Sequence, residues 1–87
     1  MNAALKAVLA TMLNKHYIGG KHIPEDKIVK SKTQWLQKHE LDEFETEYKQ
    51  AVNSELFIRL KKRTGKGSDW HISLNPRKLK EIYEMIK

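Results

Sequence analysis

The chain has no cysteine, and only two prolines and four glycines occur among its 87 residues. Without cysteine it can form neither a disulfide nor a thiolate metal site, which excludes a disulfide scaffold and a cysteine-ligated zinc finger. No run approaches the roughly 20 apolar residues that a membrane-spanning helix needs. A domain of this size must therefore rely on well-packed helices or on association with a second chain.

The start of the chain lacks the features of a secretory signal peptide. Residues 1–6 contain neither a basic region nor an uninterrupted apolar stretch. We therefore expect a cytoplasmic protein, nucleoid-associated in a bacterial or archaeal cell. The composition, 39% hydrophobic and 32% charged, is too apolar for a disordered tail and too polar for a membrane protein. It predicts one small domain over residues 1–87 that does not contact a membrane.

Acidic residues are scarce except in the middle of the chain. Seventeen lysines and arginines outnumber eleven aspartates and glutamates, which gives a net charge of +6. Residues 57–80 contain eight basic residues and one acid, whereas residues 38–56 contain six acids and two lysines. Concentrated basic charge favours a polyanionic partner. Solvated surface lysine is the alternative interpretation of such a segment.

Hydrophobic periodicity predicts two helices in the first half of the chain. The first spans about residues 2–16, and its apolar stripe consists of Leu5, Val8, Leu9, Met12 and Leu13, continued by His16 and Tyr17. Asn2 is the expected N-cap and Gly19-Gly20 the stop. After a short extended piece at 21–23, a second helix is predicted from Pro24 to about Gln37.

The second half predicts a helix, a hairpin and a last helix. Asp42 followed by Glu45 fits a capping box for a third helix over about 43–54. From Leu56 the hydrophobic period changes to two, which predicts strands at 56–61 and 69–74 around a loop at 64–68. Asn75-Pro76 begins the last helix, whose apolar stripe consists of Leu79, Ile82, Tyr83 and Ile86. That stripe either covers the chain's own core or pairs with a second copy, as in a homodimer.

Alternation along the strands predicts which side chains are buried. Trp70 shares a face with Ile72 and Leu74, so we expect it in the core. Phe57 lies opposite Leu56 and Ile58 and is either exposed or covered by another element, which makes it a candidate contact for a second copy.

The order of these elements resembles a winged helix-turn-helix domain with an extra C-terminal helix. The resemblance rests on Pro24 to Leu36 as second helix, Lys38 to Leu41 as turn, Phe44 to Val52 as recognition-type helix, and Leu56 to Leu74 as wing, closing with Ser73-Leu74-Asn75-Pro76-Arg77. It implies an α+β, mainly α fold and a double-stranded DNA partner, as in a transcriptional regulator or accessory factor. The wing contacts it implies are Lys61, Lys62, Arg63, Lys66 and Ser68, and the third-helix contacts are Lys49, Gln50 and Asn53.

The first turns of the third helix depart from this pattern. They contain four carboxylates that would repel phosphates: Asp42, Glu43, Glu45 and Glu47. Two hypotheses therefore stand, namely DNA contact dominated by the wing and a protein-interaction winged helix whose acidic third helix docks a partner.

No cofactor or catalytic site is predicted. The histidines, at positions 16, 22, 39 and 71, lack the i, i+3 or i, i+4 spacing of a helical metal site, so we expect ordinary surface or capping histidines. The sequence Gly65-Lys66-Gly67-Ser68 lies between two strands, which is the wrong context for a phosphate-binding loop. The acids at 40–47 fit capping and solvation better than general acid–base chemistry, so we expect a protein that is not an enzyme.

Overall fold

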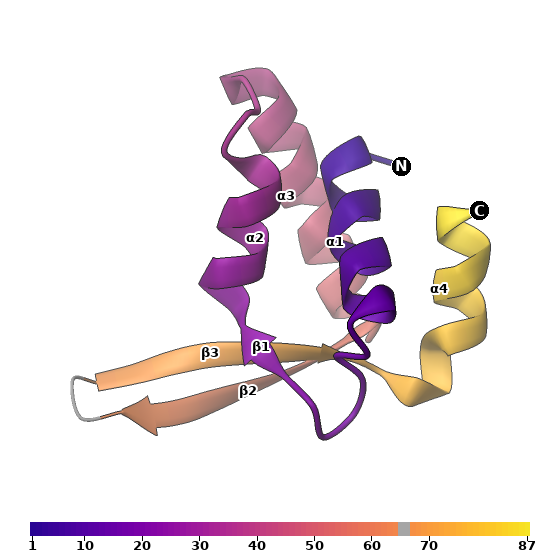
Figure 1. Cartoon of the computed structure of the whole chain (residues 1–87). Helices are drawn as coiled ribbons and strands as arrows, with labels where there is room; N and C mark the ends of the chain where they lie inside the picture. The colour runs from indigo at the N-terminus through magenta and orange to yellow at the C-terminus, as the bar shows by residue number, and fades with distance from the viewer. Residues whose placement is uncertain (65–66) are drawn as a thin grey trace.

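Helices stand on one face of a small antiparallel sheet in the computed structural model, which describes residues 1–64 and 67–87 and not the side chains of residues 64–68 (Figure 1). The elements are α1 (Ala3–Asn14), β1 (Ile23–Pro24), α2 (Glu25–Thr33), α3 (Lys38–Asn53), β2 (Phe57–Thr64), β3 (Gly67–Leu74), a 3₁₀ turn (Pro76–Lys78) and α4 (Leu79–Ile86). The expected α+β, mainly helical class is confirmed. Within the described residues, no helix is long and apolar enough to cross a membrane.

The sheet has the strand order β1-β3-β2, and both pairings are antiparallel. Phe57 pairs with Leu74 at the base of the hairpin, and Ile23 of β1 pairs with Ile72 on the other side of β3. The segment that follows α1 bonds to the last residue of β3, where the Leu74 N–H donates to the Tyr17 carbonyl at 2.8 Å. Strand β3 is therefore bonded along both edges.

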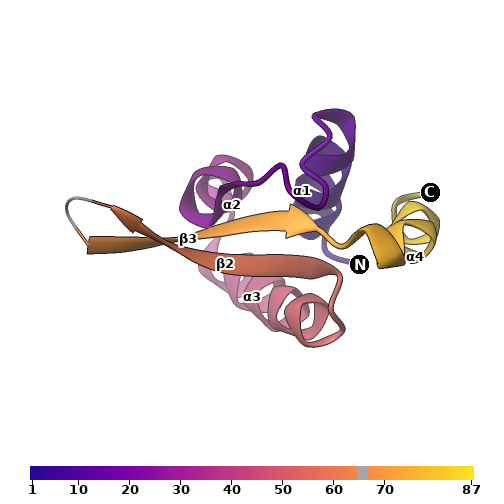
Figure 2. The same cartoon turned by 90° about the horizontal axis from the view of Figure 1, so that it is seen from below.

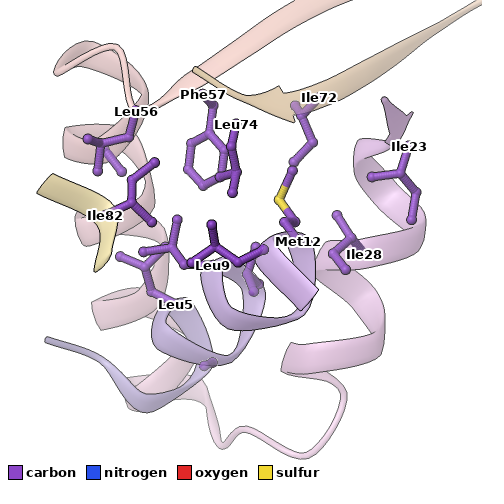
Figure 3. Close-up of a cluster of buried hydrophobic side chains, with 14 of the residues drawn as sticks. Leu5, Leu9, Met12, Ile23, Ile28, Leu56, Phe57, Ile72, Leu74 and Ile82 are labelled. Carbon is purple, nitrogen blue, oxygen red and sulfur yellow. The ribbon is translucent and has the colours of Figure 1, made fainter. Parts of the chain in front are cut away.

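α1 is the central helix of the core, and its start at the Asn2 cap is confirmed. It ends at Asn14, two residues early, because His16 takes a positive φ of 59° and turns the chain before Gly19-Gly20. The Asn2 side chain accepts a hydrogen bond from the Ala4 N–H at 2.8 Å and caps the helix. Leu9 and Met12, both fully buried, point towards the sheet, where Ile72 and Leu74 meet them (Figure 3). Burial of these side chains supplies the main stabilising free energy.

α2 and α3 meet at a different place from the one predicted. α2 ends at Thr33, four residues early, and leaves Trp35 82% exposed. α3 begins at Lys38, so residues 38–41 are helix rather than turn, and the Glu40 carboxylate accepts from the Gln37 N–H at 3.3 Å. The predicted capping box of Asp42 and Glu45 is therefore wrong. A glutamine was not recognised as N-cap because serine, threonine, aspartate and asparagine are the usual residues there.

Of the two alternatives for Phe57, cover by another element is the one found: the residue is 5% exposed, and its ring centre lies 5.3 Å from that of Tyr48 on α3. Ile58, expected on the buried face with Leu56, points to the other side and is exposed. The cause is Glu55, whose positive φ of 62° redirects the chain between α3 and β2. Leu56 is buried, but it belongs to this turn and precedes β2, which begins at Phe57. Its burial therefore does not show which side chains of β2 face the core.

α4 contributes its apolar stripe to the chain's own core. Ile82 is fully buried beside Leu5 and Leu56, with Leu79 and Ile86 partly buried around it (Figure 3). Tyr83, expected in the same stripe, is exposed. Phe57 is packed inside the core and is not available to a second copy, so a homodimer, which stays a prediction, would need another surface.

We predict that the start of α3 depends on Glu40 and not on Glu45. Glu40→Ala removes the carboxylate that accepts from the Gln37 N–H, so it should lower the free energy of unfolding by about 0.5–1 kcal/mol. Glu45→Ala, at an exposed position inside the helix, should change it by less than about 0.5 kcal/mol. Urea unfolding followed by circular dichroism measures both. Equal losses would contradict this assignment of the helix start.

Candidate nucleic-acid interface

The β2–β3 hairpin projects beyond the helices, and its outer half has no helix above it (Figures 1 and 2). The register pairs Lys61 with Trp70, Lys62 with Asp69 and Arg63 with Ser68 along this outer half. Phe57, Ile72 and Leu74 anchor the inner half in the core. The hairpin is thus a fixed base with a polar, protruding end.

Three of the predicted contacts lie together on this protruding strand. Lys61, Lys62 and Arg63 are all exposed. Alternation places Lys61 and Arg63 on the helix side and Lys62 on the opposite side, so positive charge borders both faces of the hairpin. Among the described side chains, no carboxylate forms an ion pair with Lys61 or Lys62. Lys66 and the side chain of Ser68, the other two predicted contacts, lie outside the description.

Trp70 lies on the helix side of the hairpin and is not buried as expected. It is 43% exposed and borders a hollow at the first turn of α2, which Glu25 and Asp26 also line. The Arg59 guanidinium packs over its ring at 4.5 Å, and the Lys61 ammonium lies 5.8 Å from the ring centre. The ring therefore holds two cations at the surface, an arrangement that cation–π attraction favours.

A partly buried polar network links the hairpin to α2 and α3. The Glu25 carboxylate, at the start of α2, accepts from the Arg59 guanidinium of β2 at 2.9 Å and from the Tyr48 hydroxyl of α3. Burial, strengthened by the hydrogen bond to Glu25 and its charge, raises the pKa of the Tyr48 phenol far above its usual value. The Tyr48 ring also packs between Phe44 and Phe57, at centroid distances of 5.5 and 5.3 Å.

The predicted third-helix contacts share one exposed face of α3. Lys49, Gln50 and Asn53 line a shallow hollow there. Lys49 also lines a second groove between α2 and α3, together with Arg59.

Carboxylates lie on the same face as these residues. Asp42 and Glu45 border the shallow hollow, and both are exposed because neither caps the helix. Glu47 differs, since its carboxylate accepts from the Asn2 N–H at 2.9 Å and is turned towards α1. The face of α3 is thus mixed in charge, while the outer half of the hairpin is predominantly basic.

The groove between α2 and α3 has an apolar floor. Its volume is about 340 Å³, and its lining includes Val29, Leu41 and Val52. Its lining also contains charged side chains of both signs, among them Asp26 and Glu45 and the cations of Lys49 and Arg59. The apolar residues and the two carboxylates would suit an apolar segment with basic flanks.

Two histidines meet on the sheet face opposite the helices. The Nδ1 atoms of His22 and His71 lie 2.9 Å apart, and both rings are half-buried. Burial, together with the charges of His22 and Lys62, lowers the pKa of His71. The sequence did not indicate this contact, because the two residues are 49 positions apart and meet only through the pairing of β1 with β3. In the described part of the chain, no three His, Asp or Glu side chains converge as a metal site.

Comparison of the chain with protein-family models, curated proteins and solved structures finds no match. The functional proposal therefore rests on topology, exposure and charge.

We predict that Tyr48→Phe destabilises the protein by about 1–2 kcal/mol. The substitution removes the hydroxyl that donates to Glu25 and leaves a partly buried carboxylate with one fewer partner. Tyr83→Phe, which removes the same hydroxyl from an exposed ring, should change the free energy of unfolding by less than about 0.5 kcal/mol. Chemical denaturation of the two variants makes the comparison, and similar stabilities would show that the network contributes little.

Proposed function

We propose that the chain is a winged helix that binds double-stranded DNA, with the β2–β3 hairpin as its principal contact. The order of its elements, with β1 paired to β3 beside a protruding hairpin, supports the winged-helix interpretation. The observation that carries the proposal is the exposed basic strand Lys61-Lys62-Arg63 on a rigidly anchored hairpin. A transcriptional regulator or accessory factor is the corresponding role.

The contact proposed for the hairpin is with phosphates. Lysine and arginine side chains at a strand end neutralise the backbone and fix the register of a protein on the duplex, without reading sequence. Charge on both faces of a narrow hairpin suits a groove, where phosphates flank the inserted element on two sides. Gln50 and Asn53 are the side chains of the α3 face that can each make two hydrogen bonds to adenine.

A second candidate function is the docking of a basic protein segment on α3. The apolar lining of the groove between α2 and α3, with the carboxylates of Asp26 and Glu45 beside it, favours this function, although Lys49 and Arg59 line the same groove. Docking also explains why Asp42 and Glu45 remain exposed on the helix that would otherwise enter the major groove. The two functions use different surfaces, so they can be separated by mutation.

We predict that the hairpin dominates the salt dependence of DNA binding. With about four phosphates neutralised, the logarithm of the association constant should fall with the logarithm of salt concentration at a slope of roughly −3 to −4. Replacing Lys61, Lys62 and Arg63 by alanine should reduce the slope by about 2 to 3, because each lost phosphate contact contributes about 0.9. Fluorescence anisotropy with a labelled random duplex at several salt concentrations measures this.

The matched control removes the same charge from elsewhere. Lys15 follows α1, Lys80 lies on α4 and Lys87 is the last residue, so all three are exposed on elements other than the hairpin. Replacing these three by alanine should leave most of the slope. If both triple variants lose the same amount of slope, binding depends on net charge and not on the hairpin. If the hairpin variant folds and keeps the slope of the parent, the hairpin does not contact DNA.

We also predict that the carboxylates of α3 limit DNA affinity. Asp42→Asn combined with Glu45→Gln removes two negative charges from the face that holds Gln50 and Asn53, which should tighten binding several-fold, by about 1 kcal/mol. Glu81→Gln with Glu84→Gln on α4 is the control and should have a smaller effect. If both pairs leave the affinity of the parent unchanged, α3 does not approach the duplex, and the docking function gains support.

A further inference from the structure

We propose that His22 and His71 form a binding site for a divalent transition-metal ion of the class that prefers imidazole, such as Cu²⁺, Ni²⁺ or Zn²⁺. The site lies on the sheet face opposite the helices, and the proposal does not rest on DNA binding, although Lys62 of the hairpin lies on the same face and acts on His71. His22 is the last residue before β1, and His71 lies on β3. An ion held by both would join the connection after α1 to the central strand of the sheet.

The distance between the two nitrogens fits two ligands of one ion. Bonds of about 2.0–2.1 Å that meet at a right angle, as in a square-planar Cu²⁺ or Ni²⁺ complex, place two nitrogens about 2.9 Å apart. The Nδ1 atoms of His22 and His71 are separated by 2.9 Å, where the two rings share a hydrogen bond that a bound ion would replace. A tetrahedral Zn²⁺ needs about 3.3 Å, which a small rotation of either ring provides.

The backbone holds the two rings in place. Ile23, next to His22, pairs with Ile72, next to His71, and both isoleucines are buried. The two ligands therefore come from positions fixed by the sheet and the core, which reduces the entropy lost on binding an ion.

The surroundings of the pair suit an ion that keeps some solvent ligands. Both rings are half-buried, so water can complete the coordination. The positive charge of Lys62 acts on His71 and opposes a bound cation, and the negative charge of Asp69 offsets only part of this effect. Alternation along β3 places Asp69 on the same face as His71.

The experiment titrates the untagged full chain with Ni²⁺ in a calorimeter. We expect one site per chain, and His22→Gln or His71→Gln should each weaken binding by roughly tenfold or more, because one imidazole replaces two. The control is the double variant His16→Asn and His39→Gln, which removes the two exposed histidines and should bind as the parent does. Asparagine is chosen at position 16 because this residue has a positive φ of 59°.

A second measurement does not depend on the variants folding. Zn²⁺ added to the parent chain should shift the NMR signals of the His22 and His71 rings and leave those of His16 and His39 in place. It should also raise the melting temperature, because an ion that binds only the folded state stabilises it. Binding that persists in both pair variants, or that is lost in the control, would overturn the proposal. Shifts confined to His16 and His39 would do the same.

Discussion

The central strand β3 is the element on which the other parts of the fold depend. Its edges bond to β1 and β2, and its last residue also bonds to the connection after α1. On one face it carries Ile72 and Leu74 into the core, and on the other the buried Ser73 hydroxyl donates to the Gly19 carbonyl at 2.8 Å. At this end of β3 the backbone groups on both edges have hydrogen-bond partners and the side chains on both faces are buried. Buried polar groups in a protein require such partners.

The same strand changes character along its length, and this change creates the hairpin surface. The core ends at Ile72, and beyond it Trp70 and Asp69 are exposed. A strand pair with no helix above it cannot gain stability from apolar burial, so lysine and arginine can occupy the outer half of β2 at little cost. Positive charge also protects a protruding hairpin from pairing edge to edge with another chain. Charge and stability therefore do not conflict in this part of the molecule.

Much of this fold could be predicted from the sequence where one periodic signal acts alone. The apolar stripe of α1, the alternation of β3 and the Asn-Pro start of the last helical segment were each clear, and their elements are present. Failures occurred where two signals met. Leu56 and Ile58 look like one strand face, but Glu55 redirects the chain, and Leu56 is buried from the turn. At α3 the Asp-x-x-Glu pattern inside the helix is a stronger capping signal than the true cap, Gln37. The sequence therefore predicts a helix start that is too late.

The candidate site was predicted less completely, because its main features are contacts between distant segments. The basic strand Lys61 to Arg63 is visible as a charge run, and its exposure is confirmed. Nothing local indicates that Arg59 pairs with Glu25, 34 residues away, or that it covers Trp70. The pairing removes Arg59 from the cations available to a ligand and uses it to fix the hairpin on α2.

A hairpin fixed in this way limits the kind of recognition the surface can achieve. Glu25 holds Arg59 against the body of the protein and Phe57 anchors the hairpin in the core, whereas the side chains of Lys61, Lys62 and Arg63 are exposed. The hairpin backbone is thus in place before phosphates bind, and only these exposed side chains must be ordered. Discrimination between bases then falls to Gln50 and Asn53, which lie among carboxylates. We therefore expect this surface to bind DNA mainly through the phosphate contacts of the hairpin, with weak selectivity between bases. Stronger selectivity would require a second binding element on the same DNA.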